Sequence, residues 1–559
     1  MDQITVTFNE SQAQIVIGGT VKDALIALGL EGELSTEYQE NPYVCSLVNN
    51  EVRCFSDRLI CNSALVPQRL FSDLGKRSYR QSICFLLSAA VDALYPNRRL
   101  IIDYALGDGY YFTFNDRYLL SKQTLSEIIE KMNEFQKANL PIERVLLPYQ
   151  DALSYFEQKK FDQTIDLLTT NNNPTVGLFE MAGFKDTSYE PLVPQSGLLS
   201  VWELRVYNQT GLLLRYPRSF NFTQLDTYRD NPLLFKALQK NKEQSPVIQV
   251  KSVGELSKLS MNSTISSFIR LSEEYQAKNI ADIADSICSS QSTKFVIIAG
   301  PSSSGKTTFA FKLCLQLQVR GKKTIKISLD DYFLPPDQAP KDSNGKPDLE
   351  CLEALNLPLL QNNFQDLLEG KAVALPRFDF KTHSTFERPL VQLDNQTILV
   401  IEGIHGMNPQ LYNNLENDSL FKIYISALTQ VNIDNHNRIS TTDNRIIRRI
   451  VRDYRTRGSS AEKTLSMLPS ILRGENLYIF PYQNNADVMI NSALDYELAV
   501  LSPLAQPLLR MVRPSPDMVY ATARRLLQFL NNFQPIEDTL VPPDSLLREF
   551  IGGSEYNVI

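Results

Sequence analysis

The spacing of apolar residues changes character along the chain. In the first 60 residues, Ile4, Val6 and Phe8 alternate with polar positions, and a similar stretch follows at 15–17. This alternation predicts a β-hairpin. Residues 20–29 then have helical spacing between a Thr cap and a Gly stop, and 43–48 have the composition of a strand that ends at an Asn-Asn turn. Residues 1–62 are therefore predicted to form a small β-rich domain.

Three short apolar runs in the second half, 295–299, 324–329 and 398–402, are too short and too rich in β-branched residues for helices. Such runs are typical of buried strands in a parallel sheet. Helical spacing follows them at 306–320 and from 443 onward. The pattern predicts an α/β fold, with a doubly wound parallel sheet over 291–500, preceded by the β-rich domain and by an α+β domain at 63–235.

Two further regions are predominantly helical. The polar stretch 236–290 is interpreted as a linker followed by a docking helix at 268–286. Residues 501–559 form a predicted C-terminal extension with an amphipathic helix at 518–530.

The first apolar run ends at Gly300-Pro-Ser-Ser-Ser-Gly-Lys-Thr, which fits G-x-x-x-x-G-K-[ST] at every fixed position. The glycines let backbone N–H groups turn toward a phosphate, and the helix that follows directs its positive end at the same anion. A serine-rich turn that matches by accident is disfavoured, because strand, loop, lysine and helix occur in the required order. The predicted binding residues for ATP or GTP are Gly300, Ser302, Ser303, Ser304, Gly305, Lys306, Thr307 and Thr308.

Two carboxylates follow the next two apolar runs. Asp330 comes directly after the second run, where residues of a doubly wound sheet line the ligand crevice, and it is a candidate base for an attacking hydroxyl. Its neighbour Asp331 is interpreted as a turn cap. Glu402 ends the third run and, with the hydroxyl of Thr307, is a candidate ligand of Mg²⁺.

A basic helix follows from Asp443. Arg445, Arg448, Arg449 and Arg452 fall at i, i+3, i+4 and i+7, on one face. Such a face is most often solvated. Beside a phosphate-transfer site, we interpret it as a lid whose guanidinium groups neutralise the migrating phosphoryl group.

The motifs together resemble the uridine kinase family, close kin of the phosphoribulokinases, over about 291–500. The resemblance implies Asp330 as catalytic base with Lys306, Arg449 and Arg452 as its partners, and Arg457 as a further lid arginine near ATP. It implies an acceptor pocket formed by Glu350, Phe333, Phe378, Phe380, His383 and Arg449. Glu350 stands where the family has Asp, and Phe378 where it has Tyr, which leaves the acceptor less defined than the chemistry. Without the resemblance, the favoured interpretation is that Phe378 and Phe380 are core residues of an edge strand and that His383 is a surface turn residue.

The first half resembles threonyl-tRNA synthetases. Residues 1–62 resemble the β-grasp (TGS) domain of that family, and the motifs Arg80-Gln-Ser-Ile-Cys-Phe, Asp108-Gly-Tyr-Tyr-Phe and Asn139-Leu-Pro-Ile-Glu-Arg resemble its editing domain. The family's hydrolytic side chains correspond here to Gln81, Phe85, Ser188 and Leu192. None of these can hold a metal or transfer a proton efficiently, so we expect that hydrolysis is lost.

Composition narrows the functional classes. The 559 residues carry a net charge of −7, which argues against general nucleic-acid or anionic-membrane binding. The sequence has no signal peptide and no membrane span, so a cytoplasmic protein is expected. Seven cysteines without C-x-x-C spacing indicate reduced thiols, and a homo-oligomer is compatible with the sequence.

The resulting hypothesis is phosphorylation of the 5′-hydroxyl of a pyrimidine nucleoside, uridine with cytidine as a second acceptor, using ATP and Mg²⁺. One alternative is a kinase of a sugar phosphate or another small alcohol. The other is an RNA-binding or regulatory protein in which the kinase part is a nucleotide switch.

Overall fold

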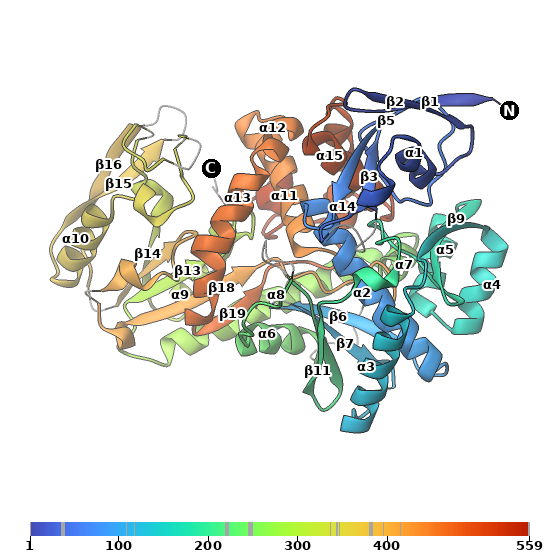
Figure 1. Cartoon of the computed structure of the whole chain (residues 1–559). Coiled ribbons are helices and arrows are strands. Elements are labelled where there is room, and N and C mark those ends of the chain that lie inside the picture. The colour runs from blue at the N-terminus through green and yellow to red at the C-terminus, as the bar shows by residue number, and fades with distance from the viewer. Residues whose placement is uncertain are drawn as a thin grey trace.

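The computed structural model describes the chain except residues 1, 35–39, 108, 117, 218–222, 244–249, 336, 342–344, 346, 380–383, 395, 414 and 557–559. Figure 1 shows the first half of the chain, in blue and teal, on the right, and the parallel sheet of the second half on the left. No helix in the described part of the chain is long and apolar enough to cross a membrane.

The N-terminal domain is a five-stranded mixed sheet in the order β2-β1-β5-β3-β4, packed against helix α1. The hairpin, the helix and the strand at 43–48 agree with the pattern in the sequence. Thr20 caps α1, because its hydroxyl accepts from the Asp23 N–H while the Asp23 carboxylate accepts from the Thr20 N–H. The elements are β1 Gln3–Phe8, β2 Ser11–Val16, α1 Val21–Ala27, β3 Tyr43–Val48, β4 Glu51–Arg53 and β5 Ser63–Arg69.

The second domain has two antiparallel sheets, in the orders β11-β12-β7-β6 and β10-β9-β8, around the long helix α2 (Asp73–Leu94). The buried positions Ile83, Leu87 and Ala90 of α2 keep helical spacing and belong to the largest apolar core. The strands are β6 Leu100–Leu106, β7 Gly109–Phe114, β8 Glu143–Pro148, β9 Thr175–Met181, β10 Phe184–Asp186, β11 Glu203–Asn208 and β12 Gly211–Arg215. The helices are α3 Lys122–Lys137, α4 Tyr149–Lys159 and α5 Asp162–Asn171.

The region interpreted as a linker is more structured than expected. It holds α6 (Pro232–Glu243), α7 (Val253–Ser260) and α8 (Ile265–Cys288). Val253 and Leu256 of α7 are buried, and α7 packs against α5. Two apolar residues three positions apart in so short a segment do not establish a helical period, which is why the sequence did not reveal α7. The predicted docking helix is α8, whose Ile280 and Ile287 pack on the parallel sheet.

The second half contains a five-stranded, wholly parallel sheet in the order β14-β17-β13-β18-β19. In the central strand, Phe295 and Ile297 belong to the core on one face, and Val296 and Ile298 to the core on the other. Burial on both faces is why the strand is apolar throughout, and the doubly wound fold class is confirmed. The strands are β13 Phe295–Ala299, β14 Lys323–Ser328, β17 Thr397–Glu402, β18 Leu420–Ser426 and β19 Val488–Asn491.

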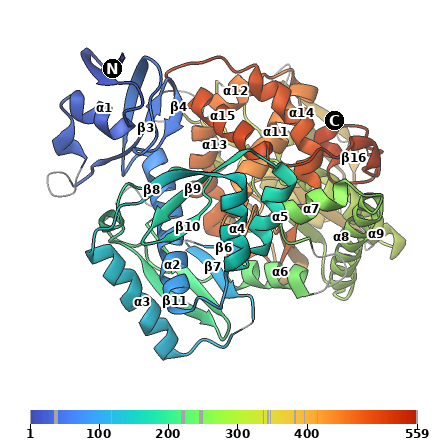
Figure 2. The same cartoon turned by 90° about the vertical axis from the view of Figure 1, so that its right-hand side faces the viewer.

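Helices and one hairpin surround this sheet. The helices are α9 Lys306–Val319, α10 Leu357–Leu368, α11 Thr441–Arg457, α12 Ala461–Ser466 and α13 Leu468–Gly474, and the hairpin pairs β15 Val373–Asp379 with β16 Ser384–Val391. The C-terminal extension continues with α14 Glu497–Arg510, α15 Met518–Leu530 and α16 Arg548–Ile551. Figure 2 shows α15 beside strand β4 of the N-terminal domain, where Arg524 pairs with Glu51 at 2.8 Å.

A buried loop of the second half, residues 431–437, forms hydrogen bonds with the first half. Asn432 Nδ2 donates to the carbonyl of Ile102 at 2.6 Å, and the Ile102 N–H donates to the carbonyl of Asn435 at 3.1 Å. His436 Nδ1 lies 2.6 Å from an Asp186 carboxylate oxygen. Burial alone would lower the pKa of His436, but the adjacent Asp186 carboxylate raises it above its ordinary value.

Candidate active site

The loop after β13 has the backbone of an anion-binding site. A side chain at Gly300 would place its Cβ 1.9 Å from the carbonyl oxygen of Ile425, so only glycine fits there. Ser303 and Gly305 have φ of 61° and 82°, which turns the chain into the first residue of α9. Successive N–H groups in such a turn, at a helix N-terminus, attract a phosphate.

Lys306 places its cation on this loop. Its Nζ donates to the carbonyls of Gly300 at 3.0 Å and Pro301 at 3.1 Å. Burial lowers the pKa of Lys306, whereas the carboxylates of Glu402 and Asp330 oppose that shift. The ammonium group is therefore hydrogen-bonded to the loop and stabilised by two acidic side chains, which suits a phosphate-binding lysine.

The strand order brings Glu402 next to the phosphate loop. β14 and β17 run in parallel, with Ser328 paired with Glu402. Glu402, 6% exposed, accepts a hydrogen bond from Ser328 Oγ at 3.0 Å, and Thr307 Oγ1 lies 3.5 Å from the same oxygen. Burial and the nearby Asp330 carboxyl raise the pKa of Glu402. A hydroxyl and a carboxylate at this separation fit the oxygen ligands that Mg²⁺ prefers.

The two adjacent aspartates have different surroundings. Asp331 accepts a hydrogen bond from the Phe378 N–H at 3.2 Å and pairs with Arg388 at 2.7 Å, so it holds the β15–β16 hairpin. Asp330 lies in the electrostatic field of Lys306, Arg457 and Arg452. Burial raises the pKa of Asp330 although these cations oppose the shift. A raised pKa makes a carboxylate a stronger proton acceptor.

Two of the four arginines that the sequence places on one face of α11 have a structural role that the sequence did not reveal. Arg445 pairs with Glu475, and Arg448 pairs with Glu497, with all four side chains almost fully buried. Arg445 and Arg448 also donate to the carbonyls of Ser302 at 3.2 Å and Ser303 at 3.3 Å. These arginines thus shape the phosphate loop instead of forming an open lid face.

Three further arginines of α11, Arg449, Arg452 and Arg457, form a cationic cluster beside the loop. Arg449 Nη1 donates to Ser302 Oγ at 2.9 Å. Asp453 is the common carboxylate of Arg449 at 3.2 Å, Arg452 at 2.7 Å and Arg457 at 3.6 Å. Burial and mutual repulsion lower the pKa of Arg449 and Arg457. Three guanidinium groups that share one carboxylate leave positive charge for an anion.

The predicted acceptor pocket lies only in part within the described residues. Burial raises the pKa of Glu350 to about 7, against the opposing charge of Arg449. The rings of Phe333 and Phe378 lie 6.5 Å apart, centre to centre, and Phe378 is buried. Phe380 and His383, the other two predicted pocket residues, lie outside the described residues.

The C-terminal extension supplies a residue that sequence reasoning missed. The carboxylate of Glu549 accepts from the Thr308 N–H at 3.2 Å and from the Thr308 hydroxyl at 2.9 Å. Glu549 therefore reaches the first turn of α9, within the predicted phosphate site. A single Glu in Leu-Leu-Arg-Glu-Phe matches no motif, so no pattern in the sequence could have indicated this contact.

The four editing-type positions of the first half separate into two pairs. Gln81 and Ser188 line a cavity, whereas Phe85 and Leu192 are buried in the apolar core. Gln81 donates to Asn437 at 2.8 Å, and Ser188 donates to the carbonyl of Glu190 at 2.7 Å. Neither pair presents the groups that activate a water molecule.

Comparison with known proteins matches both halves. Residues 295–499 match the model of the phosphoribulokinase / uridine kinase family. A uridine kinase of Macrococcus caseolyticus is 29% identical over 199 residues, which are 35% of this chain and 87% of that protein. A threonine–tRNA ligase of Desulforamulus reducens is 32% identical over 131 residues, which are 23% of this chain and 21% of that protein. A solved structure of a possible uridine kinase from Bacillus stearothermophilus matches 39% of this chain and all of that chain, at 16% identity and a TM-score of 0.27.

The matches confirm both predicted resemblances. They support a kinase of the phosphoribulokinase and uridine kinase type in the second half. The match in the first half spans about a fifth of the tRNA ligase.

Proposed function

We propose that the protein transfers the γ-phosphoryl group of ATP to the 5′-hydroxyl of a pyrimidine nucleoside, uridine with cytidine as a second acceptor. The observation that carries the proposal is that Lys306 is hydrogen-bonded to the phosphate loop at 3.0 Å and stabilised by the carboxylates of Asp330 and Glu402. A phosphate donor, a proton acceptor and candidate metal ligands then meet at the carboxyl ends of adjacent parallel strands.

Each side chain of the site has one role in the phosphoryl transfer. The 5′-oxygen of the nucleoside attacks the γ-phosphorus, and Asp330 accepts the hydroxyl proton. The bond between the γ-phosphorus and the β,γ-bridging oxygen breaks, which releases ADP. Lys306, Arg449, Arg452 and Arg457 stabilise the charge on the phosphoryl oxygens, and the loop N–H groups hold the other phosphates.

Thr307 and Glu402 are the side chains that would hold Mg²⁺. The ion, when bound to ATP, neutralises charge on the β- and γ-phosphates.

The acceptor assignment is supported by Glu350 and the aromatic pair. An ionised Glu350 accepts hydrogen bonds from ribose hydroxyls, and Phe333 and Phe378 supply an apolar slot for a planar base. A sugar phosphate would instead place a second anion beside the Glu350 carboxyl, which repels it whenever that carboxyl is ionised.

The test is a product assay with the full-length chain. ATP or GTP is mixed with uridine, cytidine, purine nucleosides or sugar phosphates, and nucleoside monophosphate is separated from its precursor. We expect UMP and less CMP, and no product with the Lys306→Ala variant. Phosphorylation of sugar phosphates alone would replace this proposal with the sugar-phosphate kinase.

A further inference from the structure

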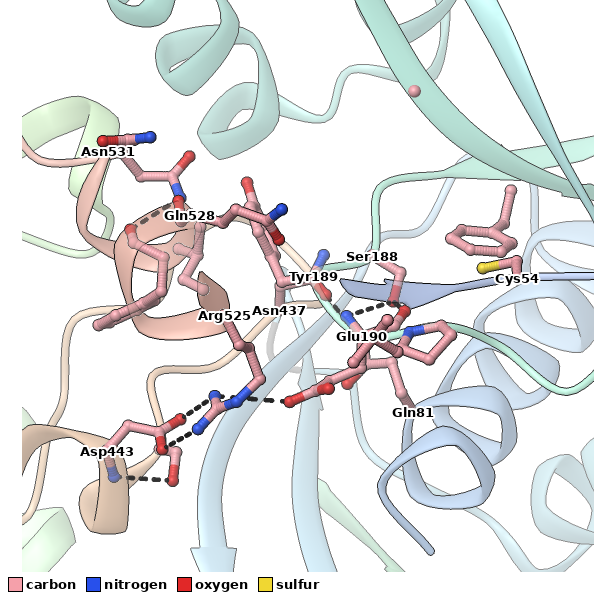
Figure 3. Close-up of a pocket in the computed structure, with 18 of the residues that line it drawn as sticks. Cys54, Gln81, Ser188, Tyr189, Glu190, Asn437, Asp443, Arg525, Gln528 and Asn531 are labelled. Carbon is pink, nitrogen blue, oxygen red and sulfur yellow. Dashed lines mark hydrogen bonds and ion pairs between the residues drawn. The ribbon is translucent and has the colours of Figure 1, made fainter. Parts of the chain in front are cut away.

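A cavity of about 540 Å³ lies between the two halves, away from the phosphate loop. Its walls come from strand β4, helix α2, the segment around Ser188, the segment 433–443 and helix α15 with the residues that follow it. Figure 3 shows this cavity, with Gln81 and Ser188 on one side and Arg525, Gln528 and Asn531 on another. The volume is in the range of small-molecule sites.

The cavity wall is rich in charge, and most of this charge is internally paired. Glu51 pairs with both Arg53 and Arg524 at 2.8 Å. Asp57 pairs with Arg144 at 2.9 Å. Arg525 lies between Asp443, at 2.7 Å, and Glu190, at 3.5 Å, as the dashed lines in Figure 3 show. Each carboxylate of the wall thus has an arginine partner.

Two further arginines of the wall, Arg80 and Arg438, take no part in these ion pairs. Within the described part of the chain, neither Arg80 nor Arg438 has a carboxylate within ion-pair distance, and the Nε of each is buried without a hydrogen-bond partner. The Arg80 guanidinium lies 5.9 Å from the ring centre of Tyr110, and Arg438 donates to the carbonyl of Thr429 at 2.8 Å. The carboxylates of Glu190 and Asp443 act on Arg80 only from beyond ion-pair distance, and an anionic ligand would supply the direct contact that both guanidinium groups lack.

The rest of the wall carries an unusual number of amide side chains. An amide carries both hydrogen-bond donors and an acceptor, as does the edge of a nucleobase. Several of these amides already bond within the wall, Gln81 to Asn437 at 2.8 Å and Asn171 to Asn532 at 3.1 Å, which holds the remaining amide atoms in fixed positions for a ligand. Aromatic rings of Tyr110, Tyr189 and Phe179 also line the cavity and offer surfaces to a planar group. The amide residues of the wall are Gln81, Asn171, Asn173, Asn437, Gln528, Asn531, Asn532 and Gln534.

We propose that this cavity binds a nucleoside phosphate, with its phosphate group at Arg80 and Arg438 and its base against the amide and aromatic side chains. The unpaired cations account for the phosphate, and the amides account for the base. This binding site is independent of the proposed kinase reaction, because it shares none of its residues with the phosphate loop, Asp330 or Glu350.

Photolabelling of the full-length protein with 4-thio-UMP and peptide mapping locates the ligand. We expect labelled peptides from the cavity wall, such as 521–534, in addition to any from the kinase site, and we expect unlabelled UMP to compete with the label. Labelling confined to the kinase site would overturn the proposal.

Calorimetric titration with UMP then measures the contribution of the two cations. Arg80→Gln and Arg438→Gln should each weaken cavity binding by about tenfold or more, because each removes a charge-assisted contact. Arg513→Gln, an exposed arginine outside the cavity, is the control and should bind as the wild type does. Retained kinase turnover shows that a variant is folded. If Arg438→Gln does not fold, Arg80→Gln alone tests the phosphate contact.

Unchanged affinity in folded Arg80→Gln would overturn the assignment of the phosphate. Ribose 5-phosphate is the second probe, because it carries the phosphate without the base. We expect it to bind at least about tenfold more weakly than UMP, since it lacks contacts with the amides. Equal affinity for both would overturn the nucleoside part of the proposal.

Discussion

Glu549 gives the sharpest prediction, because its carboxylate accepts two hydrogen bonds from Thr308 in the first turn of α9. A nucleotide phosphate bound by the loop would compete for the same N–H group and would meet a negative charge. Glu549→Gln keeps the shape and one acceptor oxygen but removes that charge. We therefore expect the variant to bind ATP more tightly.

The size of the effect follows from Coulomb's law. Two unit charges about 4 Å apart repel by ~1 kcal/mol in water and by ~4 kcal/mol near a protein surface. Glu549 is partly exposed, so the lower part of this range applies. A change of about 1.4 kcal/mol corresponds to a tenfold change in affinity.

Initial rates of UMP formation at varied ATP measure this effect. The KM for ATP should fall about tenfold in Glu549→Gln, with kcat within about twofold of wild type. Glu555→Gln changes an exposed carboxylate in the same C-terminal segment and should leave the KM for ATP unaltered. An unchanged or increased KM for ATP in folded Glu549→Gln would refute the reasoning.

Three further predictions concern the kinase half and one the first half. Asp330→Asn should lower kcat by orders of magnitude and leave ATP binding nearly intact, as rate and nucleotide-binding measurements can check, whereas loss of activity in Asp331→Asn with retained folding would move the base by one residue. Because the pKa of Glu350 is raised to about 7, its carboxyl is neutral at lower pH, so the KM for uridine should fall as pH rises through about 7, and Glu350→Gln should abolish this dependence. Arg448→Met should destabilise the chain by about 3–5 kcal/mol in denaturant unfolding, since it strands the buried Glu497, and a loss below about 1 kcal/mol would contradict the structural role. The isolated first half should not hydrolyse seryl-tRNA, and measurable deacylation would overturn the interpretation of its four altered positions.

Local patterns predicted much of the fold. The phosphate loop, the flanking strands, α11 and α15 each follow from spacing and caps within one segment, as at Gly458, which ends α11 with a φ of 61°. The runs that indicated β13 and β17 are apolar throughout because both strands are buried on both faces, whereas β18 and β19 lay outside the predicted runs.

Contacts between distant segments could not be predicted. The sequence placed Arg445 and Arg448 on the same helical face as Arg449, but their partners, Glu475 and Glu497, lie 30 and 49 residues away. Side-chain pairing over such distances leaves no periodic signal. The same applies to Glu549, 241 residues from Thr308, and to the cavity, whose walls come from both halves of the chain.

The central claim is the transfer of phosphate to a nucleoside hydroxyl, and the most direct measurement is product identification by mass spectrometry after reaction of [γ-¹⁸O]ATP with uridine. The account predicts UMP that carries the labelled phosphoryl group, formed by wild type and absent with Lys306→Ala. Release of labelled inorganic phosphate without UMP, at equal rates with and without uridine, would contradict it.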